Sequence, residues 1–199
     1  MMRGFREAAK CIYRLQVPFE TLYTSVFLIV TPTGVILVDC ATTDADVDGY
    51  IVPALREMGL TLNDIKALVL THRHSDHAGG LSRVLSLAPG IEVIFDVRPL
   101  EDGLCVYPMA GHTSDCIGVL DTRTGTLITG DGLQGAGVGK YRCSVKDSTA
   151  YLETLTRIQN DQRIQNILFS HAYEPWYKDR ITGRAEIKAC LRDCAAYVS

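Results

Sequence analysis

The sequence predicts a layered α+β fold, and three observations support this. Apolar runs of strand length alternate with segments whose apolar residues recur at helical spacing. Each of the five histidines lies where a strand-like run gives way to a loop or helix, and such positions meet along one edge of a layered fold. A length of 199 residues suits one substantial core, so we expect a single domain over residues 1–199.

The first strands lead to a buried aspartate. Residues 11–17 and 20–31 are strand-like, and the turn at 32–34 returns the chain through residues 35–38. Asp39 ends that run. An unpaired carboxylate at the end of a buried strand is costly, so we expect Asp39 to hydrogen-bond the backbone or to support a metal-binding histidine from behind. A simple turn residue is the alternative.

Residues 42–58 favour a helix in their second half. Acidic residues come early and Arg56 comes late, as the helix dipole prefers. Pro53 must then lie in a first turn or at a kink, and Gly59 ends the segment.

The most informative stretch is Thr71–Gly80, which reads Thr-His-Arg-His-Ser-Asp-His-Ala-Gly-Gly and follows an apolar strand at 65–70. His72 and His74 are two residues apart, and this spacing sends both imidazoles to the same side of an extended backbone. Their side can hold a divalent cation. The alternative is a polar loop that happens to carry histidines.

Asp76 and His77 follow where the chain turns into a helix, expected from about residue 77 to residue 87 and stopped by Pro89-Gly90. Imidazole and carboxylate together suit a second divalent cation on this side of the loop.

The second half of the chain repeats the pattern of strands that end in polar residues. Residues 91–95 and 103–109 alternate like strands, and His112 follows the second of them. The further expected elements are a hairpin of residues 116–120 and 126–129 that delivers Asp131, a helix at 148–160 capped by Asp147 or Ser148, a strand at 164–170 that runs into His171, and a helix at 185–198.

Composition and charge argue against several classes of protein. The net charge of −3 gives no general attraction to nucleic acid. No apolar run approaches the ~20 residues that cross a bilayer, and the N-terminus has no secretion signal, so a cytoplasmic location is expected. Seven scattered cysteines fit a reducing compartment, and Cys190 and Cys194 are expected as core thiols rather than as a metal site.

Together these motifs resemble the metallo-β-lactamase superfamily, and the resemblance implies a four-layer αββα sandwich, the metallo-β-lactamase fold. The matching elements occur in that family's order: Asp39 at a strand end, the His-x-His-x-Asp-His signature within Thr71–Gly80, Gly111-His112-Thr113, Thr129-Gly130-Asp131 and Ser170-His171.

The resemblance also implies a binuclear metal centre and a hydrolytic mechanism. Two divalent cations are expected, Zn²⁺ first, with Fe or Mn as alternatives. A hydroxide that bridges them would be the nucleophile, and Asp76 would orient it and take its proton. The implied ligands are His72, His74 and His112 for one cation, Asp76, His77 and His171 for the other, and Asp131 as the bridge.

Within the superfamily, the chain is similar to the glyoxalase II group, the hydroxyacylglutathione hydrolases. The residues that would hold an anionic substrate are Lys140, Tyr141 and Arg142 on a loop, with Tyr173 after the last histidine. Two departures stand out. The chain ends after a single helix where that group carries a helical second domain, and Val138 replaces its usual cysteine.

The sequence therefore predicts a metal-dependent hydrolase that cleaves a thioester, ester or lactone of a small anionic molecule. The expected partner is this substrate alone, without nucleic acid or membrane, and a homodimer is left open. A phosphodiesterase or nuclease on the same metals is one alternative, and an iron-binding redox or sensor protein is another. A true β-lactamase is disfavoured because those enzymes generally lack the bridging carboxylate that we assign to Asp131. A structural metal is disfavoured because structural zinc sites are normally closed by thiolates.

Overall fold

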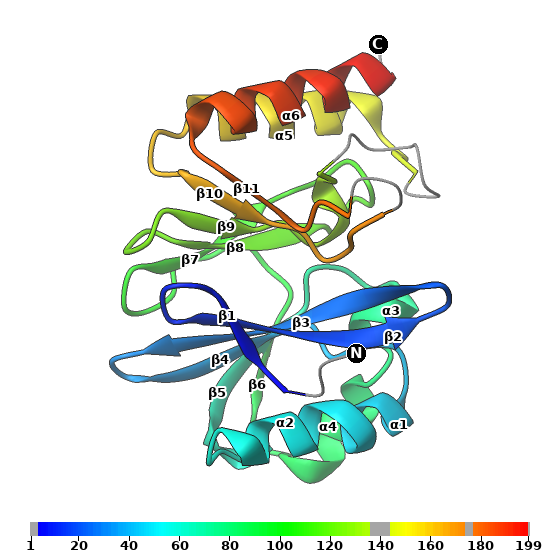
Figure 1. The fold of residues 1–199 in the computed structure, drawn as a ribbon, viewed down its shortest axis with the longest axis vertical. Coiled ribbons are helices and arrows are strands. Elements are labelled where there is room, and N and C mark those ends of the chain that lie inside the picture. Colours follow the sequence, from blue (N-terminus) through cyan, green and yellow to red (C-terminus); the bar gives the residue numbers. More distant parts are fainter. Residues whose placement is uncertain (1–3, 136–143, 174–176, 199) are drawn as a thin grey trace. The chain divides into compact units, whose positions relative to one another are not determined.

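The computed structural model describes residues 4–135, 144–173 and 177–198. The chain folds into two compact units, Met1–Phe95 and Asp96–Ser199. Each unit combines one β-sheet with helices (Figure 1), so the predicted α+β class is confirmed. That both units act as one domain stays a prediction.

The first unit is built on a six-stranded sheet in the order β1-β2-β3-β4-β5-β6. Strands β1 to β4 are antiparallel neighbours, whereas β4, β5 and β6 run parallel, so their carboxyl ends share one edge. The edge strand β1 was not predicted. The bounds are β1 Arg6–Ala9, β2 Ile12–Phe19, β3 Leu22–Thr31, β4 Gly34–Val38, β5 Ile65–Val69 and β6 Glu92–Ile94.

The helix predicted within residues 42–58 begins earlier than expected. Thr43 caps its first turn through a capping box with Asp46, and a π-helical turn precedes Pro53, which lies in the first turn of the next segment. The helical segments are α1 Asp44–Asp46, η1 Val47–Ile51, α2 Val52–Glu57 and η2 Leu62–Asp64.

The single helix predicted for residues 77–87 is wrong. Two helices occur instead, α3 Ser75–Ala78 and α4 Leu81–Leu87. The helix is interrupted at Gly79 and Gly80 because the backbone there packs against the loop that follows β4. A Cβ atom on Gly79 would lie 1.9 Å from the Thr42 carbonyl oxygen, which only glycine permits.

The second unit contains a five-stranded sheet in the order β11-β10-β9-β8-β7. The predicted hairpin is present as β8 and β9, and β9 pairs in parallel with β10. The short edge strand β11 was not predicted. The bounds are β7 Leu104–Pro108, β8 Ile117–Asp121, β9 Thr126–Ile128, η3 Gly130–Gly132, β10 Asn166–Leu168 and β11 Arg180–Thr182.

Two long helices, α5 Ser148–Asn160 and α6 Arg184–Val198, lie side by side over this sheet (Figure 1). Asp147 caps α5 by accepting a hydrogen bond from the Ala150 amide, as predicted. Cys190 and Cys194 are buried in the core on one face of α6, so their prediction as core thiols is confirmed. Among the described residues, no helix has both the length and the apolar character that a membrane crossing requires.

Candidate metal centre

The predicted ligands of the first unit follow β5, and the supporting Asp39 follows the neighbouring parallel strand β4. Asp39 follows β4 and Thr71 follows β5, and the Asp39 amide donates to the Val69 carbonyl at 2.9 Å. Asp39 is fully buried, and its carboxylate accepts hydrogen bonds from the Thr71 amide at 2.8 Å and the Thr71 hydroxyl at 2.9 Å. The Asp39 carboxylate therefore fixes the start of the loop that carries the predicted ligands.

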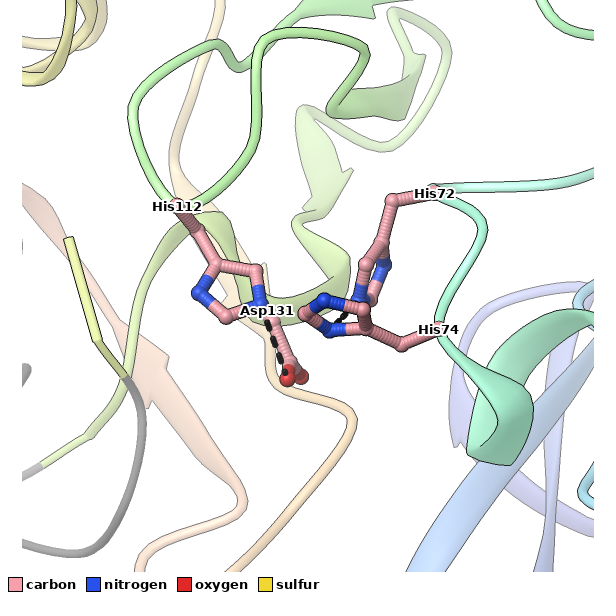
Figure 2. Close-up of side chains that lie close together, drawn as sticks. All are labelled: His72, His74, His112 and Asp131. Atoms are coloured by element: carbon pink, nitrogen blue, oxygen red, sulfur yellow. Dashed lines mark hydrogen bonds and ion pairs between the residues drawn. The ribbon is translucent and has the colours of Figure 1, made fainter. Parts of the chain in front are cut away.

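His72 and His74 face each other on that loop (Figure 2). His72 Nε2 lies 3.0 Å from His74 Nδ1, and the two rings meet edge to face. On its other side, His72 Nδ1 lies 3.2 Å from the Thr71 hydroxyl oxygen. Because that hydroxyl donates its proton to Asp39, it accepts one from His72 Nδ1. This bonding pattern leaves a lone pair on His72 Nε2, directed toward His74.

His77 and Asp76 form a second donor pair. His77 Nδ1 lies 2.8 Å from the Asp39 carboxylate, and both side chains are fully buried. A neutral ring that donates its Nδ1 proton to Asp39 presents the lone pair of Nε2, and this atom lies 3.3 Å from Asp76 Oδ2. Two lone pairs facing each other in a buried site repel unless a cation or a proton lies between them. A histidine supported by a carboxylate from behind is the usual arrangement of a metal ligand.

The predicted ligands of the second unit follow three separate strands. His112 follows β7, Asp131 follows β9 and His171 follows β10. Asp131 Oδ1 lies 3.1 Å from His171 Nε2, and Asp131 Oδ2 lies 3.8 Å from His112 Nε2 (Figure 2). The carboxylate therefore turns one oxygen toward each histidine. His112 Nδ1 is 2.6 Å from the Ser144 carbonyl and donates to it, so the His112 lone pair is on Nε2.

The donor set of each unit fits a divalent cation. Within the first unit, ligand atoms of His72 and His74, and likewise of Asp76 and His77, lie within 4.8 Å of each other. Within the second unit, the same holds for Asp131 with His112 and for Asp131 with His171. Imidazole nitrogen and carboxylate oxygen are ligands shared by Zn²⁺, Fe²⁺ and Mn²⁺.

The predicted substrate-binding residues are placed only in part. Lys140, Tyr141 and Arg142 lie outside the described residues. Tyr173 is partly buried beside His171, with ring centroids 5.7 Å apart.

Two buried thiols lie close in sequence to the predicted ligands, and neither belongs to the clusters of candidate ligand atoms found among the described residues. Burial, and then the neighbouring Asp39 carboxylate, raise the pKa of Cys40 far above its ordinary value. Burial likewise raises the pKa of Cys116, four residues after His112, to about 11. Without a metal beside them, both groups are therefore neutral thiols at pH 7.

Two groups that orient the predicted ligands were not predicted from the sequence. The Thr71 hydroxyl links Asp39 to His72, and the Ser144 carbonyl fixes His112. Thr71 stands next to the first histidine, and this position could have signalled its role. A backbone carbonyl carries no signal in the sequence.

Comparison with known proteins agrees with this architecture. The sequence model of the "Metallo-beta-lactamase superfamily" matches residues 20–97, which include the whole Thr71–Gly80 stretch. A hydroxyacylglutathione hydrolase from Vibrio cholerae is 27% identical in an alignment of 163 residues, and the match covers 69% of this chain and 63% of that protein. The chain thus spans about three fifths of the length of such curated relatives.

Solved structures show the same fold. A metallo-β-lactamase from Erythrobacter litoralis superimposes with a TM-score of 0.72 at 21% identity, covering 95% of this chain and 94% of that one. A metallo-β-lactamase from Pseudomonas aeruginosa superimposes with a TM-score of 0.74 at 18% identity, covering 98% and 96%. The fold expected from the motifs, and the resemblance that predicted it, are both confirmed.

Proposed function

We propose that this member of the metallo-β-lactamase superfamily is a binuclear metal-dependent hydrolase that cleaves a thioester, ester or lactone of a small anionic molecule. The observation that carries the proposal is Asp131, which turns one carboxylate oxygen toward His112 and the other toward His171. A carboxylate in this position can be shared by two cations. The similarity to proteins named hydroxyacylglutathione hydrolase supports an acyl substrate, and a thioester above all.

In the proposed centre, each cation would be held by four side chains. Three neutral imidazoles leave a coordination position open for water, as catalytic sites require, and a shared carboxylate screens two cations held ~3.5–4 Å apart. Zn²⁺ is the expected metal. In this assignment, one cation is held by His72, His74 and His112, the other by Asp76, His77 and His171, and both by Asp131.

The bound cations would supply an acidic water and polarise the substrate carbonyl. The protein's own residues do the rest. Asp39 and the Ser144 carbonyl hold His77 and His112 in the tautomer that presents Nε2. Asp76, buried next to His77, is positioned to orient the nucleophile and accept its proton.

The test is a substrate panel with purified protein loaded with Zn²⁺ or Mn²⁺. Glutathione thioesters, p-nitrophenyl esters and lactones are offered, together with bis-p-nitrophenyl phosphate. We expect acyl hydrolysis to be fastest. A protein that binds two cations and cleaves none of the acyl compounds, or cleaves the phosphodiester faster, would contradict the proposal. Iron found by elemental analysis, with a visible absorption band and no hydrolysis, would favour the redox or sensor alternative.

Two substitutions test the proposed roles. Asp131→Ala is expected to lose metal and activity together, and a variant that keeps two cations would refute the bridge. Asp76→Asn is expected to keep the fold and lower kcat by about 10²–10⁴, the usual contribution of a proton-transferring group.

The anionic part of the substrate is proposed to bind Lys140, Tyr141 and Arg142, with Tyr173 beside His171. Lys140→Ala should raise KM for anionic substrates and leave KM for neutral esters unchanged. Lys188→Ala, on the exposed face of α6, is the control and should change neither.

A further inference from the structure

A threonine interrupts the buried apolar stripe of α5. Thr154 is 1% exposed and lies among Tyr151, Leu155 and Ile158 on the face of the helix that packs into the core. Its hydroxyl donates to the Ala110 carbonyl at 2.8 Å. A buried hydroxyl costs free energy unless it is hydrogen-bonded, and valine would fill the same volume without that cost. The feature that threonine adds at this position is the bond to Ala110.

Ala110 begins the turn that carries His112. The next carbonyl, that of Gly111, accepts from the Lys146 amide at 2.9 Å and the Asp147 amide at 3.1 Å. Gly111 has φ +142° and packs so closely on Tyr151 that a Cβ atom would lie 2.6 Å from that side chain. The turn is therefore hydrogen-bonded at two consecutive carbonyls, one to α5 itself and one to the residues just before it.

The orientation of the His112 imidazole depends on the position of this turn relative to α5. Its Nδ1 donates to the Ser144 carbonyl at 2.6 Å, and Ser144 lies just before the cap of α5. Helix α5 thus contacts the backbone that precedes His112. The segment before the helix contacts the His112 ring. If the turn shifts along α5, the Nδ1 hydrogen bond lengthens and Nε2 changes direction.

We infer that Thr154 is a positioning residue for the metal ligand His112. The inference rests on the proposed function, in which His112 binds one of the two cations. Thr154 touches neither cation nor substrate. It fixes the Ala110–His112 turn on α5, so that Nδ1 meets Ser144 and Nε2 faces Asp131. Partners that orient a ligand from outside the coordination sphere commonly change metal affinity by about 10–100-fold.

Four variants isolate the effect of the Thr154 hydroxyl. Thr154→Val removes it and keeps the shape, whereas Thr154→Ser keeps it. Thr156→Val makes the same change two residues along the helix, at an exposed threonine whose hydroxyl bonds the Leu152 carbonyl of its own helix at 2.8 Å. Thr154→Cys, whose thiol is a weaker donor, should fall between wild type and Thr154→Val, and it serves in place of Thr154→Val if that variant does not fold.

Two measurements separate positioning from general stability. The first is Co²⁺ affinity by chelator competition, together with the visible spectrum of the Co²⁺ protein. The second is the ¹⁵N chemical shifts of the His112 ring in metal-free protein, which report which nitrogen carries the proton.

We expect Thr154→Val to weaken Co²⁺ binding at one of the two sites about 10-fold or more, to alter the visible spectrum, and to mix the His112 tautomers. Thr154→Ser should restore all three readouts, and Thr156→Val should leave them at wild type. The inference is overturned if Thr154→Val keeps wild-type affinity and wild-type His112 shifts, or if Thr156→Val loses as much. If wild type itself binds no cation, the proposed function fails, while the ring shifts of metal-free protein still test the role of Thr154.

Discussion

The two units hold their predicted ligands in different ways. In the first unit, four ligands lie within residues 72–77, and side chains hold the loop, above all the buried Asp39 with Thr71. In the second unit, three ligands come from three strand ends, and main-chain carbonyls and helix α5 fix His112. A short loop that carries several predicted ligands can be held in place by one buried carboxylate. Predicted ligands that follow separate strands are instead positioned by those strands. Disturbing the first unit should therefore displace several ligands together, and disturbing the second should displace one.

The largest expected effect is that of Gly79→Ala. A Cβ atom there would meet the Thr42 carbonyl oxygen at 1.9 Å and the Ser75 carbonyl oxygen at 2.5 Å, so the ligand loop must separate from the loop after β4. We expect a loss of more than about 3 kcal/mol in the free energy of unfolding, together with weakened binding of both cations. Urea unfolding and metal titration measure the two. Gly49→Ala, where a Cβ atom would meet nothing within 4 Å, is the control, and an equal loss there would refute the explanation.

Asp39→Asn tests the anchor itself. The amide keeps the shape of the carboxylate but offers a single acceptor oxygen to the Thr71 amide, the Thr71 hydroxyl and His77 Nδ1. We expect a loss of about 2–3 kcal/mol from unsatisfied buried donors and a 10–100-fold loss in metal affinity. The exposed Asp44→Asn should stay within about 0.5 kcal/mol of wild type. Equal metal affinity in Asp39→Asn and wild type would show that Asp39 does not orient His77.

Arg184→Lys should affect stability without affecting the metal centre. The Arg184 guanidinium donates to the carbonyls of Ile158, Gln159, Asp161 and Ile164 at the end of α5. Lysine cannot reproduce this fork, so we expect a loss of about 1–2 kcal/mol in the free energy of unfolding. Metal affinity should stay at wild type, since these contacts lie at the last residues of α5 and beyond it, whereas the His112 turn contacts Thr154 and the residues before the helix. A 10-fold loss in affinity would show that the helix transmits disturbance along its whole length.

The smallest effect is expected in the labelling of two thiols by iodoacetamide. Cys40 lies in the loop that holds the first unit's ligands, and Cys116 lies near His112, so each reports the opening of one ligand cluster. Because the pKa of Cys116 is raised to about 11, its thiolate fraction and labelling rate should rise about tenfold per pH unit from pH 8 to pH 10. Mass spectrometry of digested protein separates the two rates. Labelling that does not depend on pH in this range would contradict the raised pKa.

The same contrast explains what the sequence could predict. The ligand loop and helix α5 were predicted because their signals are local: four ligands in one stretch, and Asp147 as the cap of an amphipathic segment. The break at Gly79 was missed because it depends on Thr42, which is distant in the sequence.

Other features of the second unit were missed for the same reason. Strand β11 has only three residues and is defined by its pairing with β10. The contacts of Thr154 with Ala110 and of Ser144 with His112 likewise join positions far apart in the chain. Periodicity and local motifs carry no information about such partners.

The most direct test of the account counts the cations bound per chain in His74→Ala, His112→Ala and the double variant. We propose that these two histidines bind the same cation. Wild type should bind two cations, and each single variant and the double variant should bind one, because the second substitution removes nothing that the first has left. A double variant that binds none, while each single variant binds one, would assign the two histidines to different cations and contradict the proposed centre.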